Sequence, residues 1–476
     1  MSLPRARIVV ALVIAILATA CAPGPDVGGS GSATATIPPS STTSVVPPTT
    51  VPDEGAPEGL GPQAGPPELF PVDPADLPPV DFVDGRIAFH GATAAIRSGK
   101  VTTDLVIDTL PAQPTWSRDG SRLAVVALDG REPTISIFDG ETGDPLFTNP
   151  TDRLYYFLSW SHDGTRIAAL GGEIDENGTP RTVLDLLDAD GTVVQSDVAS
   201  AGSLYVAWDL GDLRLVAHAD DRLLRVDPDG TATDIGAAGL QFFAPKWIPQ
   251  TDDILVVADI EGSDYLVRRT VNGLDTLQSL GEADTEIGIS VNPDGRVAAI
   301  SRNFEVEGGE GAERIGLPAV FPQTATTMSG AIEILDLETG TRVEVFSGLN
   351  LWAEWNPQGT HLLIYEAGTA PESEAEEDAE FDTGTWWVYE HDPTAFEPNP
   401  PVEVVTFSPT PTFARSYLAF GDQYIESPRL WSPDGTRFVY AEVTDAGSLV
   451  RTGDIDGADT PTTVGAGEVG FWSPGT

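Results

Sequence analysis

The feature that most constrains this chain is a short motif, best formed at residues 431–439 as WSPDGTRFV, which recurs along the sequence. Its chemistry is that of a tight hairpin turn. Pro433 presets φ at the second turn position, Asp434 bonds nearby backbone, and Gly435 adopts the left-handed conformation that ends the turn. The alternating apolar residues that follow indicate a half-buried strand. Each copy of the motif therefore predicts a pair of antiparallel strands.

Copies of the motif recur at the period of a propeller blade. Five of the seven intervals between successive copies are 39 to 48 residues long, and the other two are 64 and 76 residues. A period of about 40 residues is typical of a four-stranded propeller blade. We therefore predict an all-β fold, a β-propeller of eight four-stranded blades, over residues 84–476. The position opening each copy, called the anchor here, is Trp116, Trp160, Trp208, Trp247, Val291, Trp355, Trp431 and Trp472.

The two ends of the repeat array each hold half a blade. The last copy, beginning at Trp472, has no second strand after it, while Asp84-Gly85-Arg86 matches the second half of the motif without a preceding Trp. Pairing of the N- and C-terminal strands would close the ring and remove exposed sheet edges. Eight blades follow, with seven as the alternative if the degenerate copy at Trp208 is not a blade.

Acidic turns recur later in each repeat, as in Asp188-Ala-Asp190-Gly191 and Asp227-Pro-Asp229-Gly230. Asp before Gly is ordinary turn chemistry, and calcium ligation is the alternative. An EF-hand loop would need further ligands and a downstream Glu, so the turn interpretation is favoured.

The repeated Trp-Ser-x-Asp-Gly signature resembles that of the TolB-like family of β-propellers, relatives of the WD-repeat class, over residues 84–476. This resemblance implies the propeller fold. The family includes periplasmic scaffolds, peptidase propeller domains and sugar lyases, so it leaves the function open.

Residues 1–21 read as a bacterial lipoprotein signal peptide. Arg5 and Arg7 precede an apolar run that is too short for a membrane span. Residues 17–21 resemble a lipobox, in which the cysteine is lipidated and becomes the mature N-terminus. Cys21 is the single cysteine of the chain, so it has no intrachain disulfide partner. We expect Cys21 to carry a lipid such as palmitate; a cleaved secretory peptide with an incidental cysteine is the alternative.

Residues 22–83 read as a disordered linker. They contain no Lys or Arg, are rich in Pro, Ser, Thr and Gly, and show no apolar periodicity. Such a composition cannot bury enough apolar surface to offset the entropy of ordering. The linker would hold the propeller away from the membrane.

Three insertions enlarge the later repeats, at residues 302–330, 368–384 and 408–427. All three are expected in connections on one face of the ring, where repeat proteins often place recognition. The second contains an acidic run at residues 371–382. In the third, four aromatic residues recur at helical spacing. Packing on their own domain is the more common role of such a stripe, and ligand binding is the alternative for Phe413, Tyr417, Phe420 and Tyr424.

The negative net charge disfavours negatively charged partners. The formal net charge is −48, which disfavours nucleic acid and anionic lipid surfaces, so membrane attachment would depend on the lipid alone. The five histidines share no short metal-ligand spacing and are expected to be bystanders. No hydrolase, zinc-protease, phosphate-loop or dinucleotide motif is present. We predict no catalytic residues, cofactor or metal, although propeller active sites assembled from single residues would leave no local motif.

Together these features predict a monomeric lipoprotein on the extracytoplasmic face of the cell membrane. The propeller is expected to act as a non-catalytic binding or scaffold module for a protein or glycan of the cell envelope. A propeller lyase or hydrolase acting on polysaccharide is the alternative.

Overall fold

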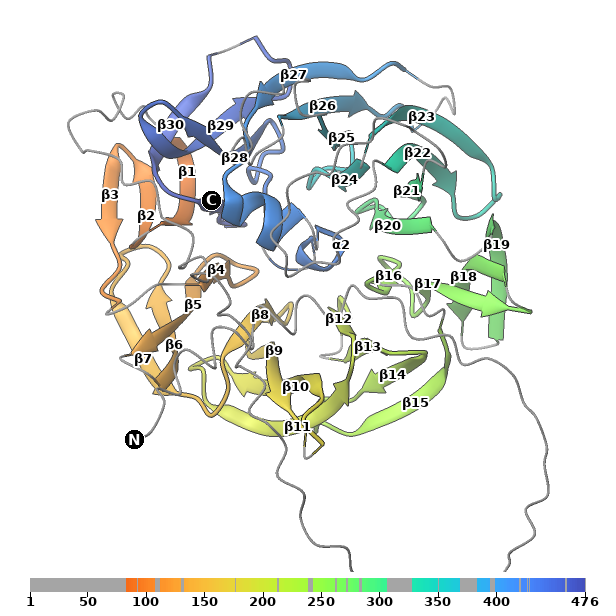
Figure 1. The fold of residues 1–476 in the computed structure, drawn as a ribbon, viewed down its shortest axis with the longest axis horizontal. Helices are drawn as coiled ribbons and strands as arrows, with labels where there is room; N and C mark the ends of the chain where they lie inside the picture. Colours follow the sequence, from red (N-terminus) through yellow and green to blue (C-terminus); the bar gives the residue numbers. More distant parts are fainter. Residues whose placement is uncertain are drawn as a thin grey trace, which may run out of the picture.

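The computed structural model describes most of residues 83–475, with the longest gaps at 306–327 and 369–382 and shorter gaps elsewhere. Its strands form eight sheets arranged in a ring, which is a β-propeller (Figure 1). The predicted all-β fold with eight blades is confirmed, including the degenerate blade at Trp208. The predictions for residues 1–82, among them the lipidation of Cys21, concern residues outside the described part of the chain.

Each blade is an antiparallel meander in which the first strand lies innermost. The first blade consists of β4 (Ala112–Trp116), β5 (Arg122–Asp129), β6 (Glu132–Asp139) and β7 (Pro145–Pro150), and the second of β8 (Tyr155–Trp160), β9 (Arg166–Ile174), β10 (Pro180–Asp188) and β11 (Val193–Ala201). The third consists of β12 (Leu204–Trp208), β13 (Leu215–Ala219), β14 (Arg222–Val226) and β15 (Ala232–Ala237). The fourth consists of β16 (Lys246–Trp247), β17 (Ile254–Ile260), β18 (Ser263–Thr270) and β19 (Gly273–Gly281).

The next three blades repeat the pattern with one reduced strand. The fifth blade consists of β20 (Thr285–Val291), β21 (Val297–Glu305), β22 (Met328–Asp336) and β23 (Arg342–Leu349). The sixth consists of β24 (Leu351–Trp355), β25 (His361–Ala367), β26 (Gly384–Glu390) and β27 (Val402–Phe407). The seventh contains β28 (Arg437–Thr444), β29 (Gly447–Asp454) and β30 (Thr462–Ala466). In the seventh blade the innermost strand is reduced to a single bridge between Trp431 and Phe438.

The eighth blade joins the two ends of the described chain. Its strands are β31 (Val469–Trp472), β1 (Val83–His90), β2 (Ala94–Gly99) and β3 (Val101–Asp104), in that order across the sheet. β31 pairs antiparallel with β1, from Ile87 opposite Trp472 to His90 opposite Val469. The predicted closure of the ring by the terminal strands is therefore confirmed.

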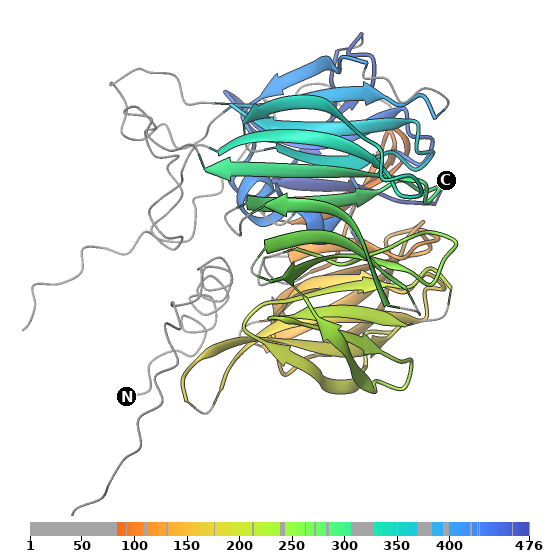
Figure 2. The ribbon, with the colours of Figure 1, turned by 90° about the vertical axis from the view of Figure 1, so that its right-hand side faces the viewer.

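The ring has two different faces. The turns between first and second strands and between third and fourth strands lie on one face, called the turn face here; Figure 2 shows the C-terminal residues on it. The connections between second and third strands and between blades lie on the other, called the insert face. As predicted, the first insertion lies between β21 and β22, and the second lies between β25 and β26. The central residues of both insertions lie outside the described range.

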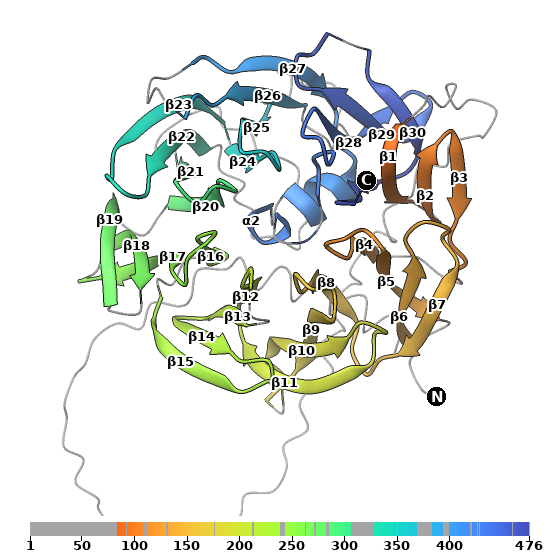
Figure 3. The ribbon, with the colours of Figure 1, turned by 180° about the vertical axis from the view of Figure 1, so that it is seen from behind.

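The third insertion folds into two short helical turns inside the ring. These are a π-helical turn, η1 (Phe413–Tyr417), and α2 (Gly421–Tyr424). Figures 1 and 3 view the ring from opposite sides, and both show these turns within the circle of innermost strands. Residues 410–427 are called the plug below.

Candidate functional site

The anchor tryptophans connect neighbouring blades by a repeated hydrogen bond. In six blades the indole Nε1 donates to the backbone carbonyl of the residue just before the anchor of the preceding blade. Trp160, for example, donates to Thr115, and Trp208 to Ser159. The N···O distances are 2.9–3.2 Å for Trp116, Trp160, Trp208, Trp247, Trp355 and Trp431. The sequence identifies these residues as apolar anchors, and the structure adds a polar role.

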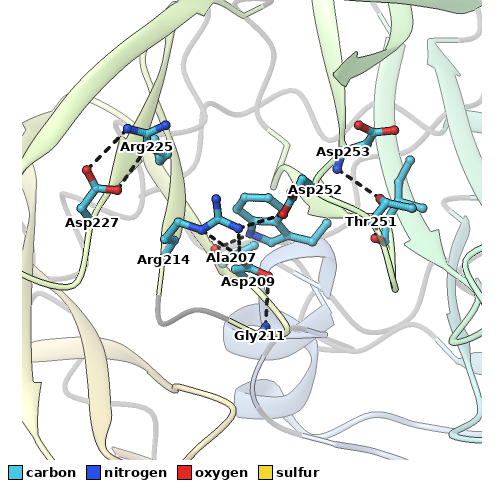
Figure 4. A network of polar contacts seen from close by, with 11 residues as sticks. Ala207, Asp209, Gly211, Arg214, Arg225, Asp227, Thr251, Asp252 and Asp253 are labelled. Atoms are coloured by element: carbon cyan, nitrogen blue, oxygen red, sulfur yellow. Dashed lines mark hydrogen bonds and ion pairs between the residues drawn. The ribbon is translucent and has the colours of Figure 1, made fainter. Parts of the chain in front are cut away.

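Arginines near the start of the second strands contact turns or carboxylates on the turn face. Arg86 donates to the carbonyl of Gly140 in the next blade at 2.7 Å, and Arg122 donates to that of Ala189 at 3.0 Å. In Figure 4, Arg214 lies between Asp209 and Asp252, with N–O distances of 2.5 Å and 3.0 Å. These arginines serve the ring itself, because each is engaged with turns or carboxylates of the protein.

The acidic turns are closed by their own carboxylates. Asp190 accepts a hydrogen bond from the amide of Thr192, Asp229 accepts one from Thr231, and Asp336 accepts two, from Glu338 and Thr339. Within the described part of the chain, no three His, Cys, Asp or Glu side chains are grouped as metal ligands would be. The geometry of these turns is thus the ordinary turn chemistry favoured from the sequence.

The aromatic residues of the plug are part of the protein core. Phe413, Tyr417 and Tyr424 are 0%, 1% and 3% exposed, and Phe420 lies outside the described residues. Their rings stack in series, with centroids 5.5 Å apart for Phe413 and Tyr417 and again for Tyr417 and Tyr424. Three of the four candidate binding residues therefore pack on their own domain and present no surface to a partner.

Polar contacts fix the plug against innermost strands around the channel. Gln423, 4% exposed, accepts from the amide of Val206 at 2.8 Å and donates to its carbonyl at 2.9 Å. Asp422 accepts from the amide of Ala244 at 2.6 Å, and the buried amine of Lys246 donates to the carbonyl of Asp422. Since these contacts belong to the third and fourth blades, the plug reaches across the ring from its attachment beside the seventh.

The plug runs from the insert face toward the turn face. The hydroxyl of Tyr424 donates to the carbonyl of Tyr156, and the hydroxyl of Ser427 donates to that of Leu158, two residues further along β8. The space inside the ring is thus occupied by the protein's own side chains over this length. The sequence predicts that the third insertion lies on the insert face, but its apolar stripe is buried in the channel instead.

Three basic side chains gather at the turn-face end of the channel: Arg118, His162 and Arg429, all half-buried. Burial is the main cause that lowers the pKa of His162, to about 3, and the charges of Arg118 and Arg429 lower it further, against a smaller opposing effect of Asp163. His162 is therefore neutral at physiological pH, and the two guanidinium groups lie within electrostatic range of its ring.

The other histidines have structural surroundings. The Nδ1 of His218 lies 3.0 Å from the carbonyl oxygen of Phe243, and its ring lies against Phe243. His391 packs edge-on to Trp355, and burial lowers the pKa of His90 to about 4. The bystander role expected from the sequence stays a prediction, and the electrostatic effect of Arg118 and Arg429 on His162 has no signal in local spacing.

Comparison with known proteins gives a likeness of fold. No family model and no curated protein matches the sequence. Solved structures similar to this chain include a eukaryotic initiation factor (12% identity, 82% of this chain, 98% of the other, TM-score 0.49) and an oligogalacturonate lyase in complex with manganese (15% identity, 78% and 86%, TM-score 0.41). TolB from Acinetobacter baumannii is another (16% identity, 73% and 81%, TM-score 0.35). All three TM-scores are below 0.5 and the identities are 12–16%, so these likenesses carry no argument about function, and the β-propeller fold is taken from the eight sheets of this chain itself.

Proposed function

We propose that this chain is a lipid-anchored, extracytoplasmic β-propeller that binds or organises a protein or glycan of the cell envelope without catalysing a reaction. The observation that carries the proposal is the plug. A small substrate needs a concave site lined by convergent polar groups. Here the described residues of the plug occupy the inside of the ring from the insert face, with buried aromatic rings and two hydrogen bonds between Gln423 and Val206. Recognition would then use the outer faces, which suit a macromolecular partner.

The anchoring part of the proposal rests on residues 1–21. A basic start, a short apolar run and small residues before Cys21 are the features of a lipoprotein signal. In the described residues, none of the helices has the length and apolarity needed to cross a bilayer. Attachment through Cys21 would place the propeller at the membrane surface, held by the linker.

Replacing Cys21 by Ser tests the anchor. We expect Cys21→Ser to release the protein from the membrane fraction and to abolish incorporation of labelled palmitate, while the wild-type chain retains both. Met1 and the apolar run are unchanged in this variant, so export is preserved. Continued membrane fractionation of the variant, with no label in the wild type, would show that the lipoprotein assignment is wrong.

Affinity capture tests the binding function. The full chain is expressed with its own signal peptide, cross-linked to its neighbours in cells and purified. A control protein, in which an unrelated globular domain replaces the propeller after residues 1–82, is treated in the same way. We expect envelope proteins or glycans that are enriched only with the propeller. Partners shared equally with the control, or turnover of an envelope polysaccharide by the purified full chain, would contradict a non-catalytic binding role.

A further inference from the structure

We propose that residues 76–82, the end of the predicted linker, dock on an exposed apolar surface formed by the outer strands of the eighth and first blades. This surface consists of Val101 and Val106, in and just after β3, and of Leu146 and Phe147 on β7, and it is called the apolar belt below. The inference goes beyond the proposed function, because it concerns how the propeller is held rather than what it recognises. It is also independent of the lipid anchor.

Large exposed apolar side chains are concentrated in this part of the ring. Val106 is 76% exposed, Val101 is 65% exposed, and Leu146 and Phe147 are each 43% exposed. Within the described residues, the outer strands of the third, fourth, fifth and seventh blades carry no exposed large apolar side chain. Single exposed apolar residues are ordinary on a protein surface, whereas a group of neighbouring ones indicates an interaction site.

The packing of one blade on the next brings these residues together. The turn between β6 and β7 lies against the eighth blade, since a Cβ on Gly143 would stand 2.9 Å from Thr103 and 3.4 Å from Leu105. Leu146 follows Gly143 by three residues, and Val106 follows Leu105 directly. Figures 1 and 3 show β3 and β7 next to each other on the outside of the ring. The exposed residues of the two blades therefore lie on adjoining parts of the surface.

The belt is poor in charge in a chain that is otherwise strongly acidic. β7 has the sequence Pro-Leu-Phe-Thr-Asn-Pro, with no charged residue, and β3 has only Asp104. Charged side chains and prolines are the usual means of protecting an outer strand from pairing with another strand. β7 has a proline at each end, and proline donates no backbone hydrogen bond. The belt is therefore suited to contact through apolar side chains rather than to the addition of a further strand.

The chain enters the propeller beside this belt. Val83, the first residue of β1, pairs with Gly99 on β2, and only Lys100 separates Gly99 from Val101. Neighbouring strands in a sheet lie about 4.8 Å apart, so β3 is about 10 Å from the point of entry. At about 3.1 Å per residue, the seven residues before Val83 span about 20 Å when extended, which is enough to cross β3 toward the first blade.

The segment has the composition that this surface requires. Residues 76–82 read Asp-Leu-Pro-Pro-Val-Asp-Phe, so Leu77, Val80 and Phe82 supply three large apolar side chains within seven residues. Leu77 and Val80 are three residues apart, and they would share one side of a polyproline-type segment, which has three residues per turn. Its two prolines lack an N–H group, which agrees with contact through side chains.

Charge favours this occupant over a second copy of the chain. Asp76 and Asp81 are acidic, and Lys100, one of two lysines in the whole chain, lies next to the belt. Lys100 is exposed and forms no ion pair with another described residue. Two copies meeting at the belt would each bring a formal net charge of −48, and they would repel each other. Docking of the chain's own segment is intramolecular and escapes this repulsion.

Docking would fix the place where the linker leaves the propeller. The linker would depart from the outside of the ring, between the eighth and first blades, rather than from the turn face or the insert face. Both faces would then stay open to a partner while the propeller is tethered.

Photo-cross-linking of the full chain in detergent micelles tests the docking. Benzoylphenylalanine replaces Phe147 and, in the matched control, Val402, which is 56% exposed on the outer strand β27. We expect cross-links from position 147 to residues 76–82 of the same chain, and none to that segment from position 402. A mixture of isotope-labelled and unlabelled chains separates links within one chain from links between copies. Links from position 147 only to a second copy, or none to residues 76–82, would overturn the proposal.

Hydrogen exchange measures the same contact without a probe. Replacing Leu77 and Val80 together by Ser should speed amide exchange of residues 145–150 about threefold or more, because β7 loses its cover. Replacing Val45 and Val46 by Ser is the matched control: it removes two apolar side chains from the linker and should leave the exchange of β7 unchanged. Exchange in the first variant that equals that of the wild type, or an equal change in both variants, would show that the segment does not dock on the belt.

Discussion

At the scale of single residues, the anchor tryptophan does more than fill space between blades. Six of these residues pair a buried indole N–H with a backbone carbonyl of the preceding blade. A buried donor or acceptor left without a partner costs more than the net gain of a formed hydrogen bond. The repeat therefore favours tryptophan over other large apolar residues at this position.

Two anchors offer a matched test of this role. Trp160 donates to Thr115, whereas the buried Nε1 of Trp472 has no partner among the described residues. Both side chains are at most 1% exposed. We expect Trp160→Phe to lower the free energy of unfolding by about 0.5–1.5 kcal/mol more than Trp472→Phe, because only the first removes an indole hydrogen bond. Denaturant titration measures both losses, and equal losses would show that the indole bond contributes nothing.

At this scale the sequence predicts local turns but not contacts between distant residues. The Trp-Ser-x-Asp-Gly pattern predicts where each anchor and turn lies, because turn chemistry is local. It does not predict that the indole of Trp160 meets the carbonyl of Thr115, or that Arg429 comes near His162. Those contacts join residues that are distant in sequence, and their geometry depends on the closure of the whole ring.

At the scale of elements, the plug illustrates what helical periodicity can and cannot predict. The spacing of Phe413, Tyr417 and Tyr424 indicates an apolar stripe, and all three side chains are buried. Periodicity does not state which surface a stripe covers. The blade-to-blade connection is long enough to turn inward, where the innermost strands offer backbone groups such as those of Val206.

Gln423 is the most informative position in the plug. Its amide makes two hydrogen bonds to the backbone of Val206, and replacing it with the similarly sized Met would leave a buried N–H and a buried C=O unpaired. We expect Gln423→Met to destabilise the protein by about 2–5 kcal/mol, since each unpaired buried group costs about 1–3 kcal/mol. Thermal and denaturant unfolding measure the loss. Gln195→Met, on the exposed outer strand β11, is the control and should change little; equal effects would argue that the plug contacts are weak.

At the scale of the whole molecule, the ring is closed by strands from opposite ends of the propeller. The sequence predicts this closure from the half-motifs at the two ends, and β31 pairs with β1 as expected. Closure removes the sheet edges that would otherwise be exposed. The repeat period also predicts the number of blades. Each repeat is one blade, because a blade buries its apolar surface only against its neighbours.

Truncation tests the importance of closure. Deleting residues 469–476 removes β31 and exposes the edge of β1, so the shortened protein should melt at a markedly lower temperature and aggregate. Deleting residues 22–75 is the control and should leave the melting temperature unchanged. Calorimetry and light scattering compare the two variants; unchanged stability on loss of β31 would mean that the ring closes without the C-terminal strand.

This propeller holds its own plug inside the ring, and we propose on that ground that recognition uses its outer faces. Hydrogen exchange of the full chain measures this most directly. Peptides covering residues 413–424 should be protected to the same degree as those covering β12, because Gln423 and Val206 share hydrogen bonds in the buried interior. Exchange of residues 413–424 within seconds, while β12 stays protected, would contradict the claim.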